Sequence, residues 1–198
     1  MLAVTLVQLW FTQERTGQKN QVEAGDGHGE AQIGGDFTLT DQTGALRRSS
    51  DFRGRVMLVF FGFSHCPDVC PVTVATLSKT MALLGAQADQ VAPIFITVDP
   101  EEDTPAVLKD FLANFDKRMV GLTGTPQQIK QVAEEYKVYY LKSKAAGEEK
   151  ADAPEADDTI DHSAFIYMMG KDGAYVRLFP YNATEQEMAR AIKNYLGS

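Results

Sequence analysis

The sequence predicts an α/β domain in which a central mixed sheet is flanked by helices on both faces. Two continuous apolar runs, VMLVFF (residues 56–61) and PIFITV (residues 93–98), are expected for strands buried on both sides. Between and after these runs, apolar residues recur at helical spacing. Near the C-terminus, AFIYMM and AYVRLF flank a turn at residues 171–173, which predicts a hairpin.

Each remaining element has its own local signal. FTLT and ALRR, on either side of a turn at Thr43 and Gly44, predict an N-terminal hairpin. Helix starts are indicated by Thr104–Pro105 and by the capping boxes Thr125/Gln128 and Thr184/Glu187. Four helices are expected, and the first should end near Gly85. Their apolar stripes are Val74, Leu77, Met81 and Leu84; Leu108, Phe111, Leu112 and Phe115; Ile129, Val132, Ala133 and Tyr136; and Met188, Ala191, Ile192 and Tyr195.

The resulting order is strand, helix, strand, helix, helix, hairpin and helix. A cysteine motif lies between the first central strand and its helix. Together these features predict a thioredoxin-like fold.

The bulk composition is that of a soluble globular protein. The chain is 44% hydrophobic and 23% charged. Its net charge of −8, with no cluster of lysine and arginine, argues against nucleic acid as a partner.

Three regions are predicted along the chain. Residues 1–16 begin with the apolar run MLAVTLVQLWF, about half of the roughly 20 residues that cross a bilayer, and lack the basic start of a signal peptide. We interpret them as part of a membrane anchor or an apolar leader, in preference to a short helix packed on the protein. Residues 17–35 are polar and glycine-rich and predict a flexible linker, and residues 36–198 form the folded domain. The acidic segment 148–158 is expected to lie in an exposed loop.

Both cysteines of the chain, Cys66 and Cys70, lie in FGFSHCPDVCP. The predicted strand-to-helix loop would place them at the start of a helix, a position that favours the thiolate form, so both are expected to be reactive. Their spacing is wider than Cys-x-x-Cys, so they can close into a disulfide or converge on an ion. Two thiolates suit Cu(I) or Zn, and a nitrogen ligand would complete a trigonal site.

His162 is the best-placed nitrogen ligand, since it directly precedes a hairpin strand that could pair beside the cysteine strand. Asp161 could orient its ring. A lone histidine before a strand is also commonly structural. The side chain of His65 is expected to point away from Cys66, and His28 lies in the predicted linker.

The VDPEEDTP stretch leaves one carboxylate open to two interpretations. Asp99, at the end of a strand, is either close to the active loop or structural, whereas Asp103 and Thr104 are expected to be turn and capping groups. Met168 and Met169 are expected in the core.

Three motifs in order, FFGFSHCPDVCP, TVDPEEDTP and DHSAFIYMMGKDG, resemble the Sco/SenC family of copper chaperones that assist assembly of cytochrome c oxidase. The resemblance covers the chain from about Ile33 to the end. It implies a thioredoxin-like domain, anchored in a membrane and facing the periplasm or the mitochondrial intermembrane space, with Cys66, Cys70 and His162 as copper ligands.

The resemblance also implies two functions that the sequence does not separate. One is delivery of copper to the binuclear centre of oxidase subunit II. The other is a thiol-disulfide oxidoreductase that keeps the cysteines of that subunit reduced, with Cys66 as nucleophile and Cys70 as resolving thiol, and with a thioredoxin-like reductant as a further partner. A peroxidase of the same fold is a weaker third interpretation.

Overall fold

The structure, a computed structural model, describes residues 33–141, 161–162 and 165–197, and for residues 141, 161 and 162 it describes the backbone alone. The predicted anchor, most of the predicted linker and the acidic segment therefore lie outside the described residues. The chain enters the fold at Gly34, whose N–H donates to the carbonyl oxygen of Glu135 at 2.8 Å.

The elements follow the expected alternation of strands and helices. The strands are β1 (Thr38–Asp41), β2 (Leu46–Arg48), β3 (Val56–Gly62), β4 (Val91–Thr97), β5 (Val120–Thr123), β6 (Tyr140–Leu141), β7 (Asp161–His162), β8 (Phe165–Met169) and β9 (Tyr175–Pro180). The helices are α2 (Val69–Leu84), α3 (Pro105–Leu112), α4 (Pro126–Glu135) and α5 (Glu185–Leu196), with short 3-10 helices η1 (Ser49–Phe52) and η2 (Gly85–Gln90).

A seven-stranded mixed sheet has the order β2-β1-β5-β4-β3-β8-β9. Its centre is parallel, because β4 pairs in parallel with both β3 and β5. The strands on either side are antiparallel, with β8 beside β3 and β1 beside β5. β1 and β2 form an antiparallel pair across the turn that follows Asp41. A separate two-stranded sheet joins β6 to β7.

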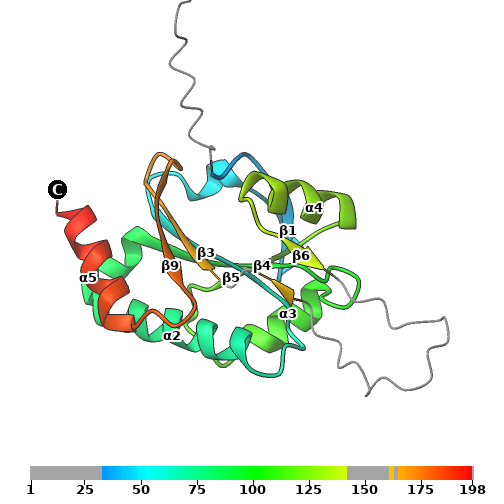
Figure 1. The fold of residues 1–198 in the computed structure, drawn as a ribbon, viewed down its shortest axis with the longest axis horizontal. Helices are drawn as coiled ribbons and strands as arrows, with labels where there is room; N and C mark the ends of the chain where they lie inside the picture. Colours follow the sequence, from blue (N-terminus) through cyan, green and yellow to red (C-terminus); the bar gives the residue numbers. More distant parts are fainter. Residues whose placement is uncertain (1–32, 142–160, 163–164, 198) are drawn as a thin grey trace, which may run out of the picture. The chain divides into compact units, whose positions relative to one another are not determined.

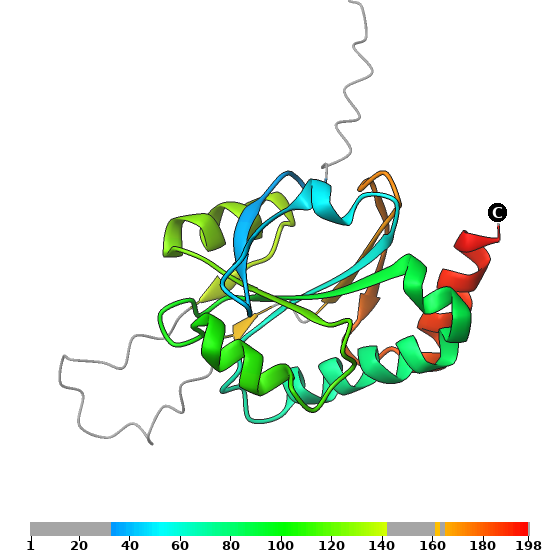
Figure 2. The same ribbon diagram turned by 180° about the vertical axis from the view of Figure 1, so that it is seen from behind.

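Helices cover both faces of the large sheet: α2, α3 and α5 lie on one side and α4 on the other (Figures 1 and 2). The fold class predicted from the sequence, a mixed sheet flanked by helices, is therefore confirmed. All seven residues of β3 and all seven of β4 are buried, which agrees with their continuous apolar sequences.

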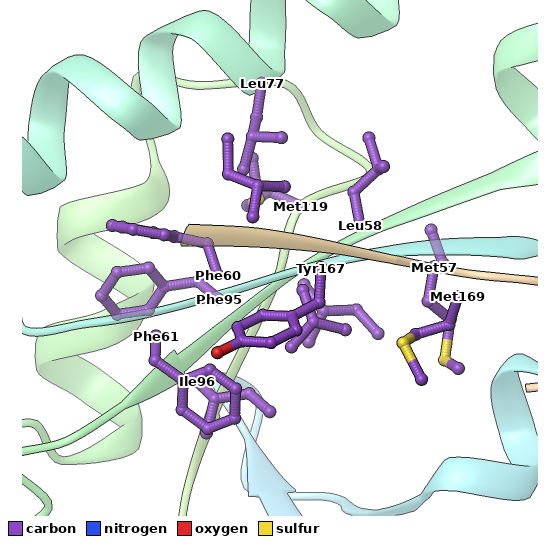
Figure 3. Close-up of a cluster of buried hydrophobic side chains, with 14 of the residues drawn as sticks. Met57, Leu58, Phe60, Phe61, Leu77, Phe95, Ile96, Met119, Tyr167 and Met169 are labelled. Atoms are coloured by element: carbon purple, nitrogen blue, oxygen red, sulfur yellow. The ribbon is translucent and has the colours of Figure 1, made fainter. Parts of the chain in front are cut away.

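The core has two halves, one on each face of the sheet (Figure 3). On one face, Leu77 of α2 lies toward Leu58 and Phe60 of β3, and the Phe60 ring is 6.1 Å from that of Phe95. On the opposite face, the ring of Phe61 packs 6.1 Å from that of Tyr167. Side chains alternate between the two halves because successive residues of a strand point to opposite faces.

Helix caps form where the sequence indicates them. The side chains of Thr125 and Thr184 accept from the backbone N–H of Gln128 and Glu187, in two complete capping boxes. Thr104 caps α3, and Gly85, with φ of 56°, follows α2.

The sequence-based element order omits β5, which pairs with both β4 and β1. The predicted topology was therefore wrong at this point, because it lacked one strand of the sheet. Its sequence, VGLT, is four residues long and contains a glycine, so it is too short to show an alternating pattern.

One helical stretch of the described chain, Val69–Gln90, is long and apolar enough to cross a membrane by composition. In the fold, Val74, Leu77 and Met81 of this stretch are fully buried in the hydrophobic core. Core packing therefore accounts for its apolar character.

Candidate copper-binding loop

The two cysteines lie at the junction between β3 and α2. After Gly62 the chain leaves the sheet, and a turn follows in which the Cys66 N–H donates to the carbonyl oxygen of Phe63 at 3.3 Å. Helix α2 begins at Val69, so Cys66 precedes the helix and Cys70 is its second residue. The expected position of the motif across the helix start is confirmed.

The Cys66 sulfur occupies a place usually taken by a capping oxygen. Asp68, the N-cap residue of α2, makes no capping hydrogen bond through its side chain. Instead, the N–H of Cys70 points to the sulfur of Cys66 at 3.4 Å. The positive end of the helix dipole therefore faces this sulfur.

The two thiols differ in exposure. Neither cysteine is in a disulfide; Cys66 is half-buried, whereas Cys70 is 0% exposed and belongs to the hydrophobic core. Burial raises the pKa of the Cys70 thiol, and the neighbouring Cys66 and Asp103 add to the increase, although a hydrogen bond with the backbone of Phe63 acts the other way. The expectation that both thiols ionise readily is therefore wrong for Cys70 in the metal-free protein.

A glycine makes room for the buried thiol. A Cβ atom added to Gly62 would lie 2.8 Å from the Cys70 sulfur and 3.1 Å from the rings of Phe60 and Phe95. Glycine within a strand commonly marks a close approach of another group, a signal present in VMLVFFG that sequence reasoning did not use. Gly62 is therefore a residue of the site that was missed.

Asp103 lies in a turn, as expected, because its N–H donates to the carbonyl oxygen of Asp99 at 2.9 Å, but its side chain is not a helix cap. Its side chain is completely buried, and its carboxylate accepts hydrogen bonds from the backbone N–H of Ser64 and the hydroxyl of Thr97. Thr104 alone caps the following helix, by accepting from Val107 N–H. Nothing in the local sequence separates Asp103 from its acidic neighbours, because one of its partners, Ser64, is 39 residues away in the chain.

The two histidines near the site are placed differently. His65 is exposed, and its Nδ1 lies 3.0 Å from the Ser64 hydroxyl and 3.9 Å from an oxygen of Asp103. His162 is in β7, where its backbone pairs with Tyr140 of β6. Its ring and the side chain of Asp161 are outside the described residues, so their predicted roles as ligand and orienting group stay predictions.

The strand that follows His162 lies where the sequence predicted it. β8 pairs with β3, the strand that leads into the cysteine loop, and Ile166 lies opposite Phe60. Met168 and Met169 are buried, as expected for core residues. Asp99 is half-buried after the end of β4, and its N–H donates to the Thr97 hydroxyl oxygen at 2.9 Å.

Among the residues whose side chains are described, no group of three or more histidine, cysteine or acidic residues is arranged to hold a metal ion. The described part of the candidate site thus consists of two thiols, one at the surface and one in the core. Two soft thiols suit Cu(I) or Zn, in agreement with the chemistry expected from the motif.

A family model for SCO1/SenC matches residues 25–197 of the chain. The chain belongs to the SCO1/SenC family. The SCO2-like protein RC0895 of Rickettsia conorii is 36% identical over 162 residues, which cover 82% of this chain and 76% of the relative. Other relatives include mitochondrial SCO2 and SCO1 homologues from cattle and human.

Solved structures of the family show the same fold. The structure of Bradyrhizobium japonicum ScoI with copper bound is 42% identical, has a TM-score of 0.71, and covers 82% of this chain and 99% of its own. BsSco, described as a member of the Sco family of cytochrome c oxidase assembly proteins with a disulfide switch, is 25% identical with a TM-score of 0.64, covering 83% of this chain and 93% of its own. The thioredoxin-like fold expected for this family is confirmed.

Proposed function

We propose that this protein binds one copper ion through Cys66, Cys70 and His162 and delivers it to the binuclear centre of cytochrome c oxidase subunit II during oxidase assembly. The observation that carries the proposal is the pair of cysteines, not joined by a disulfide, at the start of α2, in a chain 42% identical to a ScoI structure that contains copper. ScoI and yeast Sco1 are described with copper bound, and BsSco as a cytochrome c oxidase assembly protein.

The unequal burial of the thiols suits a protein that must both hold and release a metal ion. Cys66 is half-buried, so it is the sulfur that an incoming ion or a recipient's ligand reaches first. Cys70 is buried, so a bond to its sulfur is shielded from water. Copper uptake would displace the proton that burial retains on Cys70, because a coordinating thiol is deprotonated.

Chain connectivity supports His162 as the third ligand. β8 begins at Phe165, one residue before Ile166, which pairs with Phe60 close to the end of β3. Three residues of extended chain span at most about 10–11 Å, so the backbone of His162 lies within that distance of Phe165. An imidazole beside two thiolates completes a set of soft and borderline ligands suited to copper.

Thiol-disulfide exchange is the second candidate, and the same burial pattern is the observation in its favour. An accessible Cys66 could attack a disulfide of the recipient, and the buried Cys70 could then resolve the mixed disulfide. The Cys66–Cys70 disulfide so formed has no thiolate to offer copper, which would make oxidation the state that prevents loading.

We further propose that the protein works on the periplasmic face of a bacterial inner membrane. Residues 1–16 would supply or complete the anchor, residues 17–35 would act as a linker, and residues 36–198 would form the copper-binding domain. A thioredoxin-like reductant would return the Cys66–Cys70 disulfide to the dithiol.

A Cu(I) titration of the reduced protein against a chromophoric chelator tests the ligand set. Wild type should bind one equivalent, and His162→Ala, Cys66→Ser and Cys70→Ser should each weaken binding severely. His65→Ala is the matched control, since it removes a nearby imidazole outside the proposed ligand set. Unchanged affinity in His162→Ala would remove that residue from the site.

A second experiment separates delivery from reduction. Copper-loaded protein is mixed with the metal-free, reduced copper-receiving domain of subunit II, and metal-free reduced protein is mixed with the same domain in its disulfide form. Transfer of copper in the first mixture supports the chaperone. Disulfide reduction in the second, retained by His162→Ala and lost in Cys66→Ser, would support the oxidoreductase.

A further inference from the structure

A buried carboxylate lies beneath the cysteine loop, and the proposed ligand set does not include it. Asp103, in the connection between β4 and α3, has no exposed surface. Within the described part of the chain, His65 is the one basic side chain within 4.0 Å of its carboxylate, at 3.9 Å. Because an isolated buried carboxylate is strongly destabilising, its position requires hydrogen-bond donors directed at it.

Those donors come from two segments that flank the site. Thr97, the last residue of β4, donates its hydroxyl to one carboxylate oxygen at 2.6 Å. The backbone N–H of Ser64 donates to the same oxygen at 3.0 Å, and the Ser64 hydroxyl donates to the other oxygen. Asp103 is itself held by a turn in which its N–H donates to the carbonyl oxygen of Asp99 at 2.9 Å.

These bonds connect the end of β4 to the segment that leaves β3. Ser64 is two residues before Cys66, and the turn that brings the Cys66 N–H to the Phe63 carbonyl oxygen spans it. The hydrogen bond from the Ser64 N–H to the Asp103 carboxylate therefore helps to set the direction in which the chain leaves the sheet. That direction determines where Cys66 stands relative to Cys70 at the helix start.

We propose that Asp103 is a positioning residue that holds the Ser64–Cys66 segment in place and thereby sets both the copper affinity and the disulfide equilibrium of the cysteine pair. The proposal deepens the proposed copper site and rests on it for the first of these two effects. Asp103 does not contact the ion; it acts through Ser64. Groups that orient metal ligands from behind typically change metal affinity by about 10–100-fold when removed.

The chain offers a matched control in Asp41, a second buried carboxylate. Asp41 accepts from Thr43, Ala45 and Arg47 in the turn between β1 and β2, and β5 and β4 separate β1 from β3 in the sheet. Asp41→Asn therefore perturbs a comparable network far from the cysteines. It reports the effect of lost stability alone.

The test measures two properties of full-length Asp103→Asn, Asp103→Ala and Ser64→Ala. The first is Cu(I) affinity by competition with a chromophoric chelator. The second is the equilibrium with glutathione, in which the two thiols give two electrons and two protons to one glutathione disulfide, forming the Cys66–Cys70 disulfide and two glutathione molecules.

Both Asp103 variants should bind Cu(I) about 10–100-fold more weakly than wild type. They should also shift the glutathione equilibrium toward the dithiol by about tenfold, or about 30 mV, because a freer loop brings the sulfurs together less often. Ser64→Ala, which removes one of the donors, should change both properties in the same direction by less. Asp41→Asn should leave both at wild-type values.

The proposal is overturned if Asp103→Asn and Ser64→Ala match Asp41→Asn in both properties, even where Asp103→Ala does not fold. If wild type itself takes up no Cu(I), the proposed copper function fails. In that case the glutathione equilibrium alone decides the role of Asp103.

Discussion

Replacing Gly62 by alanine should damage the thiol site more than it damages the fold. The added methyl group would stand 2.8 Å from the Cys70 sulfur and 3.1 Å from two phenylalanine rings. Non-bonded carbon contacts are most favourable at about 3.5–4.0 Å, so the sulfur must move by about 1 Å. The sulfur is the end of a short side chain that is fully buried, so little other freedom is available to it.

The expected loss of stability is small. Overpacking a core typically costs about 1–3 kcal/mol, and the reduced freedom of the unfolded chain after Gly→Ala offsets about 0.4–1 kcal/mol of it. A net loss of about 1–2 kcal/mol corresponds to a decrease in Tm of about 2–8 °C for a domain of this size. Most of the protein therefore stays folded at 25 °C.

The effect on copper should be larger, because a metal site tolerates displacements of only about 0.2 Å. We expect Gly62→Ala to lower the Cu(I) affinity by about 10–100-fold, measured by chelator competition on the reduced protein. Thermal unfolding followed by circular dichroism gives the change in Tm on the same samples.

Gly121→Ala is the matched control. A Cβ atom at Gly121 in β5 would lie 2.6 Å from a methyl carbon of Leu112 and 3.4 Å from Leu108, away from both cysteines. This variant should lose stability while keeping wild-type Cu(I) affinity. If Gly62→Ala keeps wild-type affinity as well, the reasoning that Gly62 makes space for the thiol is refuted.

Three further outcomes are expected. In the reduced, metal-free protein, iodoacetamide should modify Cys66 much faster than Cys70, which mass spectrometry of Cys66→Ser and Cys70→Ser would show; equal rates would contradict the observed burial. Burial acts to raise the pKa of Asp41, but hydrogen bonds from Thr43, Arg47 and Ala45 outweigh it and hold the pKa at about 2. Because this pKa lies below that of Asp in the unfolded chain, the ionised carboxylate stabilises the fold above about pH 4, and this stabilisation is lost as the pH falls toward about 2. Asp41→Asn should therefore lower the free energy of unfolding in urea by about 2 kcal/mol at pH 7 and by less at about pH 3. Leu77→Ala should cost about 2–5 kcal/mol in the same assay, since Leu77 is fully buried between α2 and the sheet.

The parts of the fold that were predictable are those with a strong local signal. β3 and β4 are continuous apolar runs, and α4 and α5 begin with capping boxes formed by neighbouring residues. β5 was missed because its role depends on its neighbours β4 and β1 and not on its own four residues.

The difference between the two thiols could also have been predicted. The buried stripe of α2, Val74, Leu77 and Met81, continues back by one helical turn to Cys70. Cys66 precedes the helix, so the stripe does not extend to it. The expectation that both thiols are reactive considered only the helix start and left out burial, which is the largest cause of the raised Cys70 pKa.

The burial of Asp103 has no comparable local signal. Its position depends on contacts with Ser64, 39 residues earlier, and with Thr97 at the end of β4, six residues earlier. His162 is likewise 92 positions beyond Cys70 in sequence. The fold provides the evidence for the contacts of Asp103, whereas the predicted role of His162 rests on the family resemblance.

Cys70 belongs at once to the hydrophobic core and to the proposed copper site, and this connects the metal chemistry to the stability of the fold. An ion that binds the folded protein and not the unfolded chain stabilises it in proportion to the logarithm of its concentration over its Kd, by about 2.7 kcal/mol at 100 times the Kd. If Cys70 is a copper ligand, the space that Gly62 leaves for its sulfur would influence how tightly copper is held. In the proposed site, the partial exposure of Cys66 would govern how quickly copper is exchanged. A copper chaperone needs both properties, and a loop with one half-buried and one fully buried thiol could supply them separately.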